Sequence, residues 1–365
     1  MGKRWSLLAT VLLGLLLITA GWGLFRSPVP VLSFETVAYV WQNAWTQEVR
    51  AAVDRSSTRF NGYFVLVGEV DGIEASLRLH SASVDWQTLS RTHRPVTLTL
   101  RANRGLLEGR SIGETVGFLA ATLRKASAEA EKAQVRVDGV QLDYDCPTAR
   151  LVDYALLVKA LRESMHDTPL SVTALPTWLD SRAFKALIRE TDHYVLQVHT
   201  LDKPTTVDAP IVLFDAEKLP ARLERASRLR KPYFVALPTY GYRVAFDENG
   251  HFTALGAENA PALPNARIVM ADPEVLAKVV ATLRAKPPAW CRGIAWFRLP
   301  VDSDTLNWSW PALESVMKGK APSTLPLAEL RRPAKNLFEL WLTNTAGYVS
   351  DTPVAVTVRW KGTRL

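Results

Sequence analysis

A cluster of polar side chains ends a valine-rich run near the middle of the chain. Residues 135–137 lead into Asp-Gly-Val-Gln-Leu-Asp-Tyr-Asp at 138–145. Because side chains alternate between the two faces of a strand, Gln141, Asp143 and Asp145 share one face. Two carboxylates on one face lie roughly 6.6 Å apart along the strand, a spacing that lets them flank a bound sugar ring. The octet therefore predicts a carboxylate site at the end of a strand.

The same carboxylates have a structural alternative. Pro147 and Thr148 follow Asp145 and are typical of a helix start, for which Asp145 or Thr148 is a suitable cap. A cap uses one carboxylate, so it does not account for Asp143 or Gln141. The two interpretations differ in where they place the carboxyl of Asp145.

The elements that must position these residues form an alternating pattern over residues 34–315. Eight apolar runs rich in β-branched residues alternate with stretches of helical periodicity, for example 113–133 and 151–165. This pattern predicts an α/β protein with a (β/α)8 TIM barrel, in which polar residues at strand ends meet at one mouth. The predicted strands are 36–41, 63–70, 96–101, 135–145, 170–176, 194–199, 232–238 and 292–299.

The two ends of the chain are expected to form separate segments. Residues 1–27 contain a short basic flank and an uncharged apolar run, which predicts either a membrane anchor or a cleaved secretory signal. Both alternatives imply export, to the periplasmic side of the inner membrane or beyond it. At the other end, 318–333 is expected to be a linker. Residues 334–365 are expected to form a short β extension in which 337–343 pairs with 354–360.

The composition indicates a globular chain and argues against several kinds of site. The 365 residues are 48% hydrophobic and carry a net charge of +8, but the basic residues are scattered, so no nucleic-acid groove is predicted. Cys146 and Cys291 are expected to be free thiols at opposite ends of barrel strands. The six histidines lack metal-binding spacing, so neither a metal nor a cofactor is predicted.

The octet resembles the fourth-strand signature of glycoside hydrolase family 18, the chitinase-like barrels, which reads Asp-Gly-aliphatic-Asp-aliphatic-Asp-aromatic-Glu. Gln141 stands where that family has its second Asp, and Asp145 stands where it has the Glu that protonates the leaving group. Residues 170–176, 236–243 and 293–296 resemble the family's fifth, seventh and eighth strands. A closer resemblance is to a bacterial family of exported barrels, domain of unknown function 3142, which has a Tyr-Val-Trp-Gln-like first strand and a Gln-Leu-Asp-Tyr-Asp fourth.

The chitinase-like resemblance implies a carbohydrate ligand and a role for each carboxylate. In that family the acetamido oxygen of the substrate attacks its own anomeric carbon, an inner carboxylate orients it, and the acid at the strand end protonates the leaving oxygen. Carried over, Asp143 is the orienting carboxylate and Asp145 is the acid. The implied substrate-binding residues are Gln141, Tyr144, Trp41, Trp178, Gln197, His199, Tyr240 and Trp296.

Two functions remain open at this point. One is an exported glycosidase that acts on an N-acetylated or other envelope glycan, and the other is a glycan-binding barrel without catalysis. Gln141 is also expected to leave Asp143 more readily ionised than a carboxylate at position 141 would, because an amide in place of a carboxylate removes like-charge repulsion.

Overall fold

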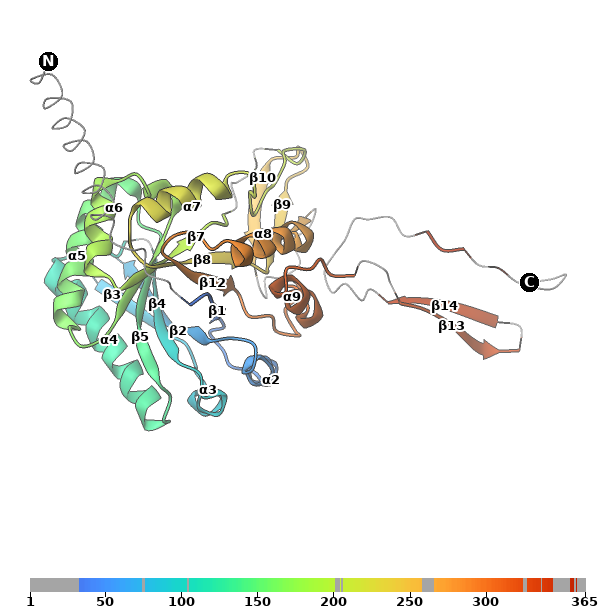
Figure 1. The fold of residues 1–365 in the computed structure, drawn as a ribbon, viewed down its shortest axis with the longest axis horizontal. Coiled ribbons are helices and arrows are strands. Elements are labelled where there is room, and N and C mark those ends of the chain that lie inside the picture. Colours follow the sequence, from blue (N-terminus) through green and yellow to red (C-terminus); the bar gives the residue numbers. More distant parts are fainter. Residues whose placement is uncertain are drawn as a thin grey trace, which may run out of the picture. The chain divides into compact units, whose positions relative to one another are not determined.

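Eight parallel strands close into a barrel (Figure 1). Each strand pairs in parallel with the next around the barrel, and β1 pairs with both β12 and β2, which closes it. This arrangement confirms the predicted (β/α)8 fold. The strands are β1 (Glu35–Val40), β2 (Gly62–Ile73), β4 (Val96–Ala102), β5 (Val137–Tyr144), β6 (Leu170–Ala174), β7 (His193–Gln197), β8 (Tyr233–Pro238) and β12 (Cys291–Phe297). The computed structural model describes residues 33–73, 76–103, 105–200, 204, 206–257, 266–323, 327–335, 337–343, 355–357 and 359.

Helices cover the outer face of the barrel (Figure 1). Their starts follow local sequence signals: Ser111 and Glu114 form a capping box at the start of α4, and Asp272 caps α8 just before Pro273. The helices are α2 (Gln47–Ser56), α3 (Trp86–Thr92), α4 (Ile112–Lys132), α5 (Leu151–Ser164), α6 (Arg182–Leu187), α7 (Leu219–Arg228), α8 (Pro273–Ala285) and α9 (Trp310–Met317). Short 3-10 turns lie at Thr148–Arg150, Pro176–Trp178 and Ile188–Glu190.

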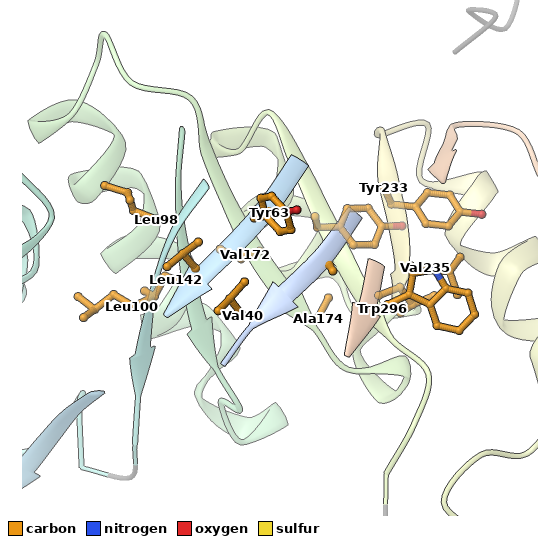
Figure 2. Close-up of a cluster of buried hydrophobic side chains, with 14 of the residues drawn as sticks. Val40, Tyr63, Leu98, Leu100, Leu142, Val172, Ala174, Tyr233, Val235 and Trp296 are labelled. Atoms are coloured by element: carbon orange, nitrogen blue, oxygen red, sulfur yellow. The ribbon is translucent and has the colours of Figure 1, made fainter. Parts of the chain in front are cut away.

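The two faces of the barrel strands bury different sets of side chains. Outward-facing residues such as Val40, Leu142 and Trp296 pack beneath the helices in the main core (Figure 2). Inward-facing residues fill the barrel itself, and their apolar members are Val37, Tyr39, Phe64, Val195, Phe234, Ala236 and Ala295. Burying one Leu, Val or Phe side chain stabilises the fold by about 1.5–3 kcal/mol, so both layers contribute strongly.

Two additions extend the barrel between its strands. A three-stranded antiparallel sheet of β9 (Gly241–Phe246), β10 (Phe252–Gly256) and β11 (Ala266–Met270) lies between β8 and α8 in the chain. β3 (Ser76–Ser81) pairs antiparallel with the end of β2. Cys146 and Cys291 are buried free thiols, one after the end of β5 and the other at the start of β12.

The C-terminal hairpin differs from the predicted one. β14 (Leu337–Thr343) is a strand as expected, but it pairs with β13 (Leu327–Ala334), which was predicted to lie mostly in a linker. The pairing is irregular between Arg331 and Ala334, and Pro333 lies at this point. Proline is tolerated at such bulges because no ladder hydrogen bond is needed there. Residues 355–357 have no regular structure, and the rest of the predicted partner strand is outside the described residues except for residue 359.

The predicted N-terminal segment, residues 1–27, lies outside the described residues. Among the residues that the structure describes, no helix is both long enough and apolar enough to cross a membrane.

Candidate active site

A cavity of about 640 Å³ opens at the carboxyl ends of the barrel strands. Its size is typical of small-molecule sites in proteins. The predicted site residues that line it are Trp41, Asp143, Asp145, Gln197, His199 and Tyr240. It is also lined by residues that sequence reasoning did not assign, among them Tyr39, Glu69, Arg101, Thr173, Phe297 and Arg298.

Asp143 is the buried carboxylate of this cavity. Thr173, on the neighbouring strand β6, donates a hydrogen bond of 2.6 Å to its Oδ1. The guanidinium of Arg101 on β4 lies 3.9 Å from its Oδ2. Burial raises the pKa of Asp143 to about 6, although Arg101 and Thr173 act in the opposite direction. Loss of solvation is the largest of these effects. That Gln141 leaves Asp143 more readily ionised than a carboxylate at position 141 would stays a prediction.

Asp145 occupies the rim of the cavity as an exposed residue. Neighbouring protein removes part of the water around its carboxyl, which raises its pKa above the ordinary value, while Arg101 opposes this shift. The following 3-10 turn and α5 both begin without a side-chain cap. The capping alternative for Asp145 therefore does not hold, and its carboxyl remains available to a ligand.

Gln141 lies deeper in the barrel than the cavity. It is fully buried, and its Oε1 accepts hydrogen bonds from the Tyr39 hydroxyl at 2.9 Å and from Thr99 at 3.2 Å. Its Nε2 donates a long hydrogen bond of 3.4 Å to Ser171. Gln141 therefore links its own strand β5 to β1, β4 and β6 below the site, and it supports Tyr39, which itself lines the cavity.

His199 and Tyr240 form a polar pair on the wall of the cavity. The hydroxyl of Tyr240 lies 3.3 Å from His199 Nδ1 and 3.3 Å from the Tyr242 hydroxyl. Burial lowers the pKa of His199 to about 3. The imidazole is therefore neutral at physiological pH, and it serves as a hydrogen-bonding wall rather than as a charged group.

Aromatic rings form one side of the cavity. Phe297, at the end of β12, meets Trp41 edge-on with ring centroids 5.1 Å apart. It also meets Tyr39 and Tyr240 edge-on, and it stacks on His199. Phe297 and Trp41 are both only partly buried. Partly exposed rings at the mouth of a barrel offer flat apolar faces to a ligand.

Besides Gln141, three more of the predicted binding residues do not line the cavity. Tyr144, Trp178 and Trp296 are all buried in the main core between the strands and the helices. Tyr144 packs edge-on against Tyr154, which also contacts Trp178, and Figure 2 shows Trp296 in this outer layer. For Tyr144 and Trp296 the physical reason is strand alternation, because a residue next to an inward-facing one must face outward. Trp178 lies in the 3-10 turn after β6, and its ring packs against Tyr154 and Phe184.

Sequence reasoning missed the basic residue of the site. Arg101 lies opposite Asp143 in the β4–β5 register, and Glu69 lies opposite Arg101 in the β2–β4 register. Alternation along β4 placed Arg101 on the same face as Thr99, and this was the available signal. A second arginine, Arg298, also lines the cavity, and it is buried and ion-paired with Asp304.

Residues 92–302, more than half of the chain, match the family described as Domain of unknown function (DUF3142). The chain belongs to this family. The match begins in α3 and extends past β12, so the DUF3142 region contains Arg101, Asp143 and Asp145. No curated protein matches the chain.

Solved structures share the fold of this DUF3142 chain. The spore cortex-lytic enzyme SleL of Bacillus megaterium is 14% identical with a TM-score of 0.55, and the match covers 76% of this chain and 72% of that one. A chitinase of Chromobacterium violaceum is also 14% identical, with a TM-score of 0.52 over 79% of this chain and 99% of its own. A chitinase of Bacteroides thetaiotaomicron is 11% identical, with a TM-score of 0.52 over 73% and 90%. At these identities the likeness shows the fold.

The donor groups of the DUF3142 site are carboxylates, hydroxyls and guanidinium groups. Within the described part of the chain, no three His, Cys, Asp or Glu side chains are placed to hold a metal ion. The chemistry that these groups offer is proton transfer, hydrogen bonding and charge stabilisation.

Proposed function

We propose that this protein hydrolyses a glycosidic bond in the cavity, with Asp145 as the general acid and Asp143 as the carboxylate that orients and charge-stabilises the sugar. The observation that carries the proposal is the pair itself: one carboxylate is buried and one is at the rim, both line one cavity, and the outer one is not used as a helix cap. Two carboxylates in unlike environments are the arrangement that acid-catalysed glycoside hydrolysis needs.

The substrate class that we propose is an envelope or extracellular glycan with N-acetylated sugars. The chitinase-like signature of β5 and the similar folds of two chitinases and a spore cortex-lytic enzyme support this class. Trp41 and Phe297 offer the aromatic surface on which a sugar ring would lie. The export of the chain, through residues 1–27, is part of the same proposal.

The proposed reaction is the one that the chitinase-like resemblance implies, with the two carboxylates in its two roles. Asp143 accepts a hydrogen bond from the acetamido N–H, and the acetamido oxygen attacks the anomeric carbon as the bond to the leaving oxygen breaks. Asp145 gives its proton to that oxygen. Water then attacks the anomeric carbon, restores the acetamido group and returns a proton to Asp145, so the enzyme is regenerated.

A second candidate function is glycan binding without hydrolysis, and one feature favours it. Asp145 is one methylene shorter than the Glu of the resembled signature, a difference of about 1.5 Å in reach. A displacement of about 1 Å at a reacting centre can lower a rate about 10²-fold.

The deciding experiment measures hydrolysis and affinity together on a panel of N-acetylated oligosaccharides. For the enzyme, Asp145→Asn abolishes turnover and leaves affinity within about threefold, whereas Asp143→Asn weakens both. Asp138→Asn, at the exposed opposite end of β5, is the matched control and changes neither. Binding without turnover in the unmodified protein supports the second function. Absence of both binding and turnover across the panel contradicts both functions.

A further inference from the structure

The guanidinium of Arg101 acts on both Asp143 and Asp145 from the neighbouring strand β4. The Arg101 side chain is 35% exposed, its Nη1 lies 3.9 Å from Asp143 Oδ2, and its Nε donates a hydrogen bond of 3.2 Å to Asn103. Asn103 in turn donates a hydrogen bond of 2.7 Å to Asp71. Arg101 is therefore held by its own neighbours and is not a freely moving surface side chain.

The same guanidinium also lies over an aromatic ring. Its Cζ is 5.8 Å from the centroid of the Trp41 ring. A planar guanidinium can stack on an aromatic face and carry an ion pair at the same time, which an ammonium group cannot do as well. Trp41 meets Phe297 and Tyr39 edge-on, so the position of its ring is set by Arg101 on one side and by these rings on the other.

We propose that Arg101 is a positioning residue of this site, which holds the Trp41 ring and the Asp143 carboxylate in one arrangement. The identity of the ligand as a sugar rests on the proposed function. The structural link among Arg101, Trp41 and Asp143 is independent of that function. Arg101 thereby connects the group that would carry the ligand with the group that would orient it.

The charged and polar groups around Asp143 determine how the loss of Arg101 would change the ionisation of its carboxyl. The groups that act on the Asp143 carboxyl are Glu69 from β2, Arg101 from β4, Asp145 from just after β5, Thr173 from β6, Tyr39 from β1 and Tyr154 from α5. Arg101 is the one cation in this set, and it stabilises the ionised form of Asp143. Without Arg101, burial and the neighbouring carboxylates would raise the pKa of Asp143 further, because only the hydrogen bond from Thr173 would still lower it.

The test follows both partners of Arg101 in the full-length protein without any ligand. The Asp143 carboxyl is followed by NMR in protein with ¹³C-labelled aspartate and is assigned with Asp143→Asn. The Trp41 ring is followed by ¹⁹F NMR in protein with fluorotryptophan and is assigned with Trp41→Phe. Both signals are recorded across the pH range in which Asp143 titrates.

Arg101→Gln removes the charge, so the titration midpoint of Asp143 should rise by about one pH unit and the Trp41 signal should shift. Arg101→Lys keeps the charge but not the planar group, so the Asp143 midpoint should stay near that of the unmodified protein while the Trp41 signal still shifts. Arg136→Gln, which breaks the exposed pair with Asp138 at the other end of β5, should move neither signal.

Unchanged signals in Arg101→Gln would overturn the proposal, and so would a change in only one of them, because Arg101 would then not join the two groups. Because no glycan is present, this result is independent of the glycan screen. A failure of the proposed function therefore remains distinguishable from a failure of this inference.

Discussion

Thr173 donates a 2.6 Å hydrogen bond to Asp143 across the β5–β6 pair, inside a barrel that excludes most water from the carboxyl. The hydrogen bond favours the ionised carboxylate, and burial disfavours it more strongly. Asp143 therefore lowers the stability of the folded chain at neutral pH, as is common for groups retained at functional sites.

The first prediction is that Asp143→Asn stabilises the protein in a pH-dependent way. The pKa of Asp143 is raised from 3.8 to about 6, so between these values the folded state binds more protons than the unfolded state. Stability is then lost as pH rises through this window. The substitution should increase the free energy of unfolding by about 1–3 kcal/mol at pH 7, with little gain near pH 4.

Denaturant unfolding at several pH values measures this effect. Asp138→Asn, exposed on the same strand, is the control and should show no pH-dependent gain. A gain for Asp143→Asn that is the same at pH 4 and pH 7 would show that burial of charge is not its cause.

The second prediction separates two neighbouring aromatic residues of β12. Phe297→Leu should weaken glycan affinity about tenfold, because a partly exposed ring of the cavity is lost at nearly constant volume. Trp296→Phe should leave affinity unchanged and lower the free energy of unfolding by about 1–3 kcal/mol, because Trp296 is fully buried against Trp308. Calorimetric titration and thermal unfolding of both variants test the assignment. The reverse pattern would place the wrong residue at the cavity.

The third prediction concerns reach at the rim. Asp145→Glu should raise turnover about 10-fold to 10²-fold, because the added methylene extends the acid by about 1.5 Å. The same change at the buried position, Asp143→Glu, should lower turnover, because a longer side chain moves the carboxyl away from the position in which Thr173 donates to it. Initial rates on one oligosaccharide give the comparison. Equal loss in both variants would mean that Asp145 already has the correct reach.

The fourth prediction concerns the seam where β12 meets β1. Gly293 has a φ of 149°, and a Cβ there would lie 1.9 Å from the carbonyl oxygen of Glu35. Gly293→Ala should therefore lower the free energy of unfolding by more than about 3 kcal/mol. Gly117→Ala, on the exposed face of α4 with no atom within 4 Å of the added Cβ, should raise it by about 0.5–1 kcal/mol. Chemical denaturation of the two variants checks both signs, and a mild effect at Gly293 would contradict the close approach of the strands.

The barrel was predictable because each of its strands is an apolar run that can be recognised from the neighbouring residues in the sequence. All eight predicted runs overlap the barrel strands, since parallel strands buried on both faces need long apolar stretches. The position of Asp143 and Asp145 at the mouth of the barrel was predictable because polar groups at the carboxyl ends of parallel barrel strands lie on the same side.

What the sequence did not decide is which face each aromatic takes and which side chains meet across strands. Trp296 and Phe297 are adjacent and both aromatic, so only the register of β12 in the closed barrel tells which one faces inward. Arg101 meets Asp143 through the pairing of β4 with β5, which composition does not reveal. The β13 strand was missed for a related reason: Pro333 and the paired arginines before it are typical of a linker, and the bulge that accommodates them is a tertiary feature.

The aromatic and aliphatic residues packed inside the barrel, such as Phe64 and Phe234, determine how a ligand can enter and leave the cavity. They make the cavity a blind chamber, so a bound molecule cannot thread through the barrel and must leave by the mouth through which it came.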